Sequence, residues 1–245
     1  MADEREVLVE VKNLEVTYGS GRKAYKAVSN ANFTIYKGET FGLVGESGCG
    51  KSTTANVMCG LQAPTSGKVY FKGKDVTKRT AEDRRHMGRV ISVVFQNPAT
   101  ALNPRMVVRE QLLDPIRVHN LGTEAEQEKR VKELLELTGL PSSAAEVLPG
   151  QLSGGQQQRV GIATALVTSP HLIIADEPTT ALDVTVQAQI LGLIRRLQKE
   201  TGTSVIFISH DMGVISQMAD RVAVMYAGPV SYTHLRAHET TLHLV

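Results

Sequence analysis

The residues that decide the fold are Phe41-Gly-Leu-Val-Gly-Glu-Ser-Gly-Cys-Gly-Lys-Ser52. The apolar run Phe41–Val44 is typical of a buried parallel strand, the stretch after it fits G-x-x-x-x-G-K-[ST], and Lys51–Leu61 is compatible with a helix. Glycines let successive backbone N–H groups turn inward around phosphate oxygens, and the helix N-terminus adds partial positive charge. We therefore predict a phosphate-binding loop in which Lys51 reaches the β- and γ-phosphates and Ser52 supplies a hydroxyl to Mg²⁺. The residues predicted to contact the phosphates are Gly45, Glu46, Ser47, Gly48, Cys49, Gly50, Lys51, Ser52 and Thr53.

The composition is that of an ordinary globular protein. The chain has 245 residues, of which 27 are basic, 25 acidic and 42% hydrophobic, so one large α/β domain with subdomains is expected. Disordered, collagen-like and strongly basic nucleic-acid-coating classes are disfavoured. Two cysteines, Cys49 and Cys59, are too few for a disulfide framework and indicate a reducing compartment. We expect no secretory signal and no membrane span, so a role at a membrane would need a partner.

Alternating apolar and polar residues predict half-buried strands in the first third of the chain, which should form an antiparallel sheet. These stretches are Val7–Val11, Leu14–Tyr18, Phe33–Tyr36 and Lys68–Phe71.

Continuously apolar runs predict strands that are buried on both faces in a parallel core sheet. Besides Phe41–Val44, these runs are Leu172–Ala175 and Ser204–Ser209. Helical spacing of apolar residues over Val184–Thr201 predicts an amphipathic helix packed on that sheet. A second helical stretch, Glu124–Thr138, lies in a region with few strand signals, so residues 98–158 are predicted to form an inserted helical subdomain.

An acidic pair, Asp176-Glu177, ends the buried run that follows His171. Adjacent residues of a strand point to opposite sides, but at its carboxyl end they can address a metal ion and a water molecule separately. Asp176 is the candidate metal ligand and Glu177 the candidate general base.

The chain resembles the ATP-binding-cassette (ABC) ATPases, because it combines the features above with a further motif just upstream of the acidic pair. This motif is Leu152-Ser-Gly-Gly-Gln-Gln-Gln-Arg159. The resemblance covers about Val7–Gly228 and includes Gln96 after a strand Val90–Phe95, Ala181-Leu-Asp183, and His210 after Ser204–Ser209. It implies an α/β P-loop NTPase with a parallel core sheet, an N-terminal antiparallel β subdomain and an inserted helical subdomain.

The resemblance also implies roles for single residues, with ATP and Mg²⁺ as cofactors. Tyr18 would stack on adenine, and Tyr25 is the alternative residue for this contact. Gln96 would touch Mg²⁺ and the attacking water, and His210 would contact the γ-phosphate. Lys51, Gln96, Glu177 and His210 are thus the predicted catalytic residues, and Ser52, Gln96 and Asp176 the predicted metal ligands.

A further implication is that two subunits sandwich two ATP molecules head to tail. Three residues of this chain, Ser153, Gly155 and Gln156, would complete the nucleotide site of the opposing subunit. Asp183 is also among the predicted nucleotide-binding residues.

Three stretches are similar to the dipeptide/oligopeptide (and nickel) importer branch of the family: Phe95–Pro104, Ala175–Gln189 and Val224–Gly228. At Leu148-Pro-Gly-Gln151 the chain departs from Tyr-Pro-His-Gln, which that branch is expected to carry. From this resemblance we expect an ATPase subunit of a peptide importer, bound peripherally at the cytoplasmic face of the inner membrane. Its expected partners are permease subunits, a second ATPase subunit and, indirectly, an extracytoplasmic solute-binding protein.

Two alternatives stay open. A non-transport ABC ATPase of DNA repair or translation would carry long coiled coils, zinc modules or a second cassette, and no such feature is visible in this sequence. A P-loop kinase would lack Leu152–Arg159 and need an acceptor site. Since the net charge is only +2, no nucleic-acid partner is expected.

The family pattern stops after Val224-Met-Tyr-Ala-Gly228. Residues 229–245 hold three of the seven histidines and none of the strand pattern expected there. We predict that the ATPase domain spans residues 1–228 and that 229–245 is an atypical tail, foreign to the domain and poorly ordered.

Overall fold

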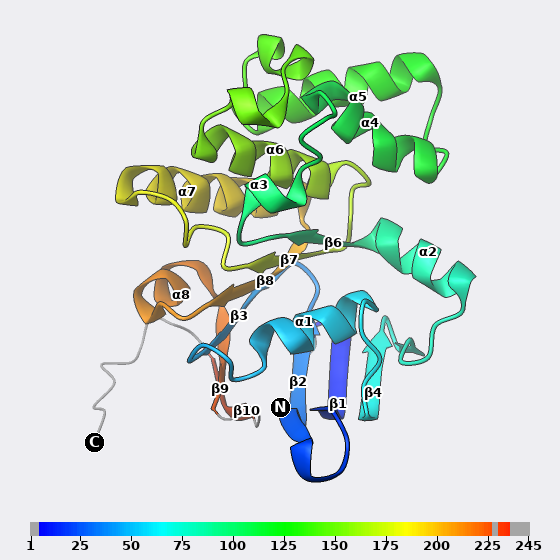
Figure 1. Cartoon of the computed structure of the whole chain (residues 1–245), viewed down its shortest axis with the longest axis vertical. Helices are drawn as coiled ribbons and strands as arrows, with labels where there is room; N and C mark the ends of the chain where they lie inside the picture. The colour runs from blue at the N-terminus through cyan, green and yellow to red at the C-terminus, as the bar shows by residue number, and fades with distance from the viewer. Residues whose placement is uncertain (1–4, 227–229, 236–245) are drawn as a thin grey trace. The chain divides into compact units, whose positions relative to one another are not determined.

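The computed structural model describes residues 5–226 and 230–235 and divides into two compact units (Figure 1). The first unit is built from residues 1–88 and 204–245, and the second from Arg89–Thr203. The division falls within helix α2 (Ala81–Val90). The predicted fold class is confirmed, because the strands form an antiparallel sheet and a parallel array with helices.

The antiparallel sheet of the first unit has the strand order β2-β1-β4-β5. Its strands are β1 (Val7–Tyr18), β2 (Tyr25–Tyr36), β4 (Ser66–Phe71) and β5 (Lys74–Asp75), with the short 3-10 turn η1 (Gly21–Lys23) between β1 and β2. The two strands predicted at Val7–Val11 and Leu14–Tyr18 are one strand. Asn13, at φ +49°, makes an irregularity there, and its N–H bonds the Asn32 side chain at 2.8 Å instead of the ladder.

The other strands of the first unit follow the order β10-β9-β3-β8. Strand β3 (Thr40–Gly45) runs parallel to β8 (Ser204–Ser209) and β9 (Arg221–Met225), whereas β10 (Val230–Leu235) pairs antiparallel with β9. Helices α1 (Lys51–Cys59) and α8 (Met212–Met218) pack on these strands. Gly42 makes the approach of α8 possible. A Cβ atom there would come within 3.0 Å of Ile215 and closer still to Ala219.

A buried ionic contact secures the start of β3. The Glu39 carboxylate accepts a hydrogen bond from the Tyr36 N–H at 2.7 Å and forms an ion pair with Arg221 at 3.1 Å. Burial raises the pKa of Glu39, while the Tyr36 N–H and the positive charge of Arg221 oppose that rise. Arg221 also donates to the Thr34 carbonyl at 2.9 Å and so ties β9 to β2.

The second unit combines two parallel strands, β6 (Ile91–Val94) and β7 (Leu172–Asp176), with a set of helices. The helices are α3 (Pro98–Ala101), α4 (Val108–Val118), α5 (Glu124–Leu137), α6 (Gly154–Leu166) and α7 (Val184–Thr201), and the 3-10 turns are η2 (Ser142–Glu146) and η3 (Pro149–Gln151). Helix α6 is central, because α3, α4, α5, α7 and β6 all contact it. The unit is wider than the predicted subdomain 98–158, since it also holds β6, β7 and α7.

Helix α5 is closed at both ends by side chains. Thr123 and Glu126 form a capping box at its N-terminus. At its C-terminus Arg159 donates to the Thr138 carbonyl at 2.7 Å and Arg196 to the Leu137 carbonyl at 2.6 Å. These basic groups interact favourably with the negative end of the helix dipole and hold α5 against α6 and α7.

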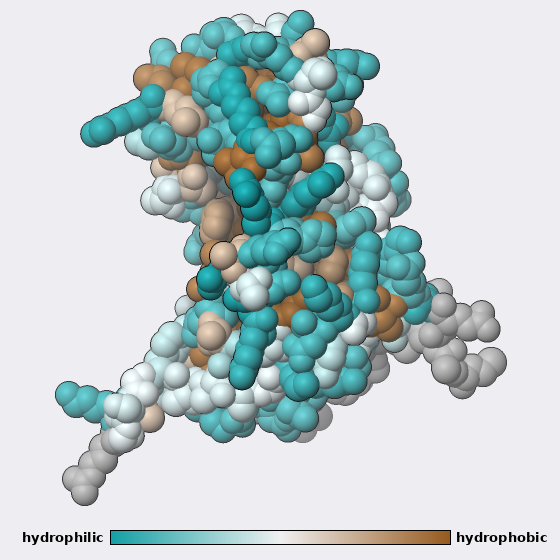
Figure 2. All heavy atoms as spheres, turned by 90° about the vertical axis from the view of Figure 1, so that its right-hand side faces the viewer, coloured by the Kyte–Doolittle hydropathy of each residue, from teal (hydrophilic) through white to brown (hydrophobic). Residues whose placement is uncertain are grey.

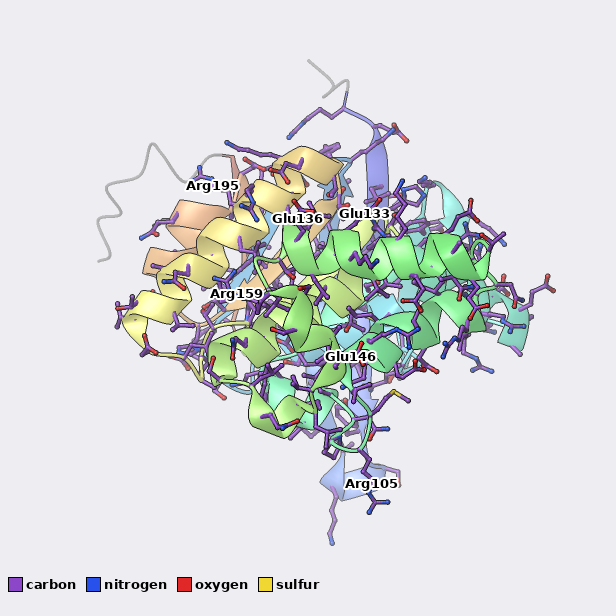
Figure 3. The ribbon with its side chains drawn as sticks, turned by 90° about the horizontal axis from the view of Figure 1, so that it is seen from above. Arg105, Glu133, Glu136, Glu146, Arg159 and Arg195 are labelled. Carbon is purple, nitrogen blue, oxygen red and sulfur yellow. The ribbon has the colours of Figure 1, made fainter. Side chains whose placement is uncertain are left out.

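Beside this contact, a cavity of about 440 Å³ lies between α5 and α7. It is lined by Glu133, Glu136, Leu137, Arg196 and Glu200, and Figure 3 labels the two glutamates on α5.

On the face that Figure 2 displays, hydrophilic residues predominate over α4 and α5, as amphipathic helices with buried inner faces require.

The tail prediction needs one correction. Val230–Leu235 forms strand β10, which pairs antiparallel with β9, so the expectation of no strand after Gly228 is wrong for these residues. Without β10 the edge of β9 would carry unpaired backbone groups, which a following extended segment can satisfy as a hairpin. Residues 227–229 and 236–245 lie outside the described residues, and the boundary at 228 stays a prediction.

Within the described part of the chain, no helix combines the length and the apolar character that crossing a bilayer requires.

Candidate active site

The phosphate loop lies where it was predicted, between the end of β3 and the start of α1. Backbone atoms crowd two of its glycines. A Cβ atom at Gly45 would overlap the carbonyl oxygen of Met225, and one at Gly50, whose φ is +102°, would overlap the carbonyl oxygen of Ala27. Because a side chain at either position would displace the backbone, glycine is what allows the loop to take this shape.

Lys51 is buried and is held by the loop itself. Its Nζ donates to the carbonyl oxygens of Gly45 at 2.7 Å and Glu46 at 2.8 Å. Carbonyl oxygens leave the ammonium charge uncompensated, so a phosphate group that reached the loop would meet a positive charge.

The N-terminus of α1 offers further anion donors. The N-cap residue is Gly50, which has no side chain that could bond the first N–H groups of the helix, and the first turn holds no acidic residue. The first N–H groups of a helix have no partners within the helix, so those of α1 are suited to phosphate oxygens. Ser52 is exposed at this end of the helix.

Two tyrosines face each other at the end of the β1–β2 hairpin. Tyr18 and Tyr25 are directly paired across the strands, and both rings are about half exposed, at 45% and 58%. The Tyr25 hydroxyl donates to the Gly48 carbonyl of the phosphate loop at 3.1 Å, whereas the Tyr18 hydroxyl donates to Gln62 at 2.6 Å. Tyr25 is thus the ring bonded to the loop, and the predicted stacking of adenine on Tyr18 stays a prediction.

His210 also belongs to the first unit and is exposed directly after β8. Its neighbour Asp211 caps α8 by accepting hydrogen bonds from Gly213 at 2.7 Å and Val214 at 3.3 Å. The cap fixes the backbone from which His210 projects.

In the second unit, the structure brings Gln96 and Glu177 together. The Gln96 Nε2 donates to Glu177 Oε2 at 3.2 Å, and the Thr180 hydroxyl donates to the same oxygen at 3.0 Å. Glu177 follows Asp176, the last residue of β7, and its φ of +46° is rare for a residue with a side chain. The acidic pair therefore stands at the carboxyl end of β7, as predicted. Sequence reasoning did not identify Thr180, because one hydroxyl three residues after a glutamate is too common a pattern to signal a contact.

The remaining predicted residues begin two helices. Ser153 caps α6 in a capping box with Gln156, whose side chain accepts from the Ser153 N–H at 2.9 Å. Gly155 is close-packed, since a Cβ atom there would lie 2.7 Å from Val186 of α7. Asp183 caps α7 by accepting from the Val186 N–H at 2.9 Å. Each of these residues thus has a local structural role, which S-x-x-Q spacing could have revealed for Ser153 and Gln156.

Comparison with known proteins gives consistent matches. The model of the ABC transporter family matches residues 28–180. The putative oligopeptide transport ATP-binding protein YkfD of Bacillus subtilis (strain 168) is 46% identical over 223 residues, which are 90% of this chain and 68% of the relative. The dipeptide transport ATP-binding protein DppD of the same organism is 45% identical over 234 residues, which are 92% of this chain and 70% of the relative.

Among solved structures, the dimeric ATP-binding cassette MJ0796 in a post-hydrolysis state, bound to ADP and Pi, is 34% identical. It superposes with a TM-score of 0.84 over 93% of this chain and 98% of that one. The protein cbiO1 of Clostridium perfringens, part of the ABC transporter complex cbiONQ, is 30% identical with the same TM-score, over 94% of this chain and 89% of that one.

Proposed function

The chain belongs to the ABC transporter family and is an ABC ATPase, and from that premise we propose that it is the ATP-hydrolysing subunit of a peptide importer. The observation that carries the ATPase part is the phosphate loop, with its crowded glycines and with the buried Lys51 ammonium hydrogen-bonded to the carbonyl oxygens of Gly45 and Glu46. The names of its relatives, which are 45–46% identical and are called oligopeptide and dipeptide transport ATP-binding proteins, support peptides as the cargo and favour transport over DNA repair or translation.

The loop suits the phosphates of ATP. The first N–H groups of α1 and the Lys51 ammonium would bind the β- and γ-phosphate oxygens, and His210 would contact the γ-phosphate. Tyr18 would provide an aromatic face for adenine.

The oxygen-bearing side chains also suit Mg²⁺. Ser52 presents a hydroxyl at the start of α1, Asp176 a carboxylate at the end of β7 and Gln96 an amide oxygen after β6, and oxygen ligands are those that Mg²⁺ prefers. When bound, Mg²⁺ neutralises charge that develops on the phosphates. Glu177 would orient the attacking water and accept its proton as the water oxygen bonds to phosphorus and the bond to ADP breaks.

A complete site is proposed to need two ATPase subunits. Ser153, Gly155 and Gln156, fixed at the N-terminus of α6, would cover the γ-phosphate bound to the opposing subunit, and Asp183 would lie at the same junction. The dimeric state of the MJ0796 cassette supports this arrangement. Closure of the pair around ATP would then move permease subunits in the membrane, with this chain bound peripherally at the cytoplasmic face and a solute-binding protein delivering peptide outside.

The substitution Glu177→Gln tests the proposal, because the amide keeps the shape of the carboxylate but cannot accept the proton. Measured with the cognate partner subunit, ATP turnover should fall by about 10²–10⁴-fold. ATP affinity should stay within about twofold, and the ATP-bound pair should accumulate in size-exclusion chromatography. Turnover near the wild-type rate in that assembly would exclude Glu177 as the base.

A further inference from the structure

The carboxylate of Glu177 is held by two donors that bond one and the same oxygen. The Thr180 hydroxyl lies 3.0 Å and the Gln96 amide nitrogen 3.2 Å from Oε2. A glutamate side chain ordinarily samples many rotamers, and hydrogen bonds to one oxygen restrict the plane in which the other oxygen can act.

Thr180 is delivered to this contact by a tight turn. Its backbone N–H bonds the carbonyl oxygen of Glu177 at 3.3 Å, so backbone and side chain of the two residues are joined twice over a span of three residues. Pro178 within the turn has a restricted φ, and Thr179 is buried. The left-handed backbone of Glu177, at φ +46°, is a conformation that persists only where the surroundings impose it.

The second donor, Gln96, lies in the segment that follows β6 and is therefore far from Glu177 in the sequence. In the proposed site its amide oxygen is also a ligand of Mg²⁺, so the position of its amide nitrogen would depend on the ion as well as on Glu177. The Thr180 hydroxyl belongs to the same turn as Glu177, so its hydrogen bond does not depend on where Gln96 points.

We propose that Thr180 is a positioning residue for ATP hydrolysis, whose hydroxyl holds Oε2 of Glu177 and so presets the carboxylate toward the attacking water. The inference rests on the proposed function, since it assumes that Glu177 is the base. Thr180 would act through its hydrogen bond to Glu177, so its contribution would belong to the chemical step and not to nucleotide binding.

The decisive variant is Thr180→Val, which keeps the branched shape and removes the hydroxyl. In the assembled ATPase, kcat should fall about 10-fold, as expected for a lost hydrogen bond to a charged group, while KM for ATP stays within about twofold. Thr180→Ser, which restores a hydroxyl, should recover most of the rate. Active sites are counted by titration with a fluorescent ATP analogue, so a misfolded fraction does not imitate a lower kcat.

Thr201→Val is the matched control. The Thr201 hydroxyl bonds the Leu197 carbonyl at 2.8 Å at the other end of α7, roughly 25 Å along the helix from its first residue, so this variant should keep the wild-type kcat. In a Glu177→Gln background, Thr180→Val should cause no further loss of rate.

These variants separate the two ideas. If Glu177→Gln keeps its turnover, the proposed base is wrong. If Glu177→Gln is inactive but Thr180→Val turns over like Thr201→Val, or if Thr180→Ser is as slow as Thr180→Val, the inference about Thr180 is overturned and the proposed base stands.

Discussion

Two glycines of the phosphate loop have similar backbone conformations but different surroundings. Gly48, at φ +82°, has no atom within 4 Å of a Cβ position, whereas a Cβ atom at Gly50, at φ +102°, would overlap the Ala27 carbonyl. Gly48→Ala should therefore cost only backbone strain, about 1–3 kcal/mol. Gly50→Ala should add displacement of the loop, lowering the free energy of unfolding further and ATP affinity at least 10-fold.

Urea unfolding and ATP titration of the two variants check this comparison. Equal losses in both variants would show that strain alone decides, and that the contact with Ala27 does not shape the loop.

The tyrosines at the hairpin end can be separated by their proposed tasks. Stacking needs only an aromatic face, so Tyr18→Ala should weaken ATP binding by about 1–3 kcal/mol, whereas Tyr18→Phe should bind almost as the wild type does. Tyr25→Phe removes the hydroxyl that bonds Gly48 and should weaken ATP and tripolyphosphate alike, because the latter has no base. Isothermal titration with both ligands provides the measurement. A larger ATP-specific loss for Tyr25→Ala than for Tyr18→Ala would assign the base contact to Tyr25.

At the scale of elements, the helices of the second unit contain glycines with opposite constraints. Gly192 lies in the middle of α7 with no atom within 4 Å of a Cβ position, but Gly155 in α6 packs against Val186. Gly192→Ala should raise the free energy of unfolding by about 0.5–1 kcal/mol, because alanine restricts the unfolded chain and favours the helix. Gly155→Ala should lower it. The midpoints of urea unfolding give both signs, and a destabilised Gly192→Ala would contradict the described packing of α7.

The same elements show what the sequence could predict. Helix α7 has the predicted bounds, Val184–Thr201, because its apolar spacing is regular and Asp183 and Gly202 mark its ends. Helix α1 was predicted to reach Leu61 but ends at Cys59, where Gly60 turns the chain at φ +76°. Strongly periodic or fully buried segments were thus predictable to within a few residues.

Other elements carried too little local signal. Helix α8 has seven residues, too few to show periodicity, and β10 depends on the free edge of β9. In the site, the loop and the acidic pair were predictable from residue types and spacing. The bonds from Tyr25 to Gly48 and from Thr180 to Glu177 were not, because they depend on how the chain folds.

At the scale of the whole molecule, the proposed catalytic residues are divided between the two units. Lys51, Ser52 and His210 belong to the first unit, and Gln96 and the acidic pair to the second. ATP hydrolysis by this account requires contributions from both, and an ATPase partner that supplies its own α6 N-terminus. Coupling of that chemistry to transport is the claim on which the proposed function depends.

The measurement that tests this claim most directly is uptake of a labelled oligopeptide by vesicles containing the cognate permease, the ATPase subunits and the solute-binding protein. We predict peptide accumulation that needs Mg²⁺ and ATP on the ATPase side and that is lost, together with hydrolysis, when this chain carries Lys51→Ala. Accumulation that persists at the wild-type rate with Lys51→Ala, or ATP hydrolysis that moves no peptide, would contradict the account.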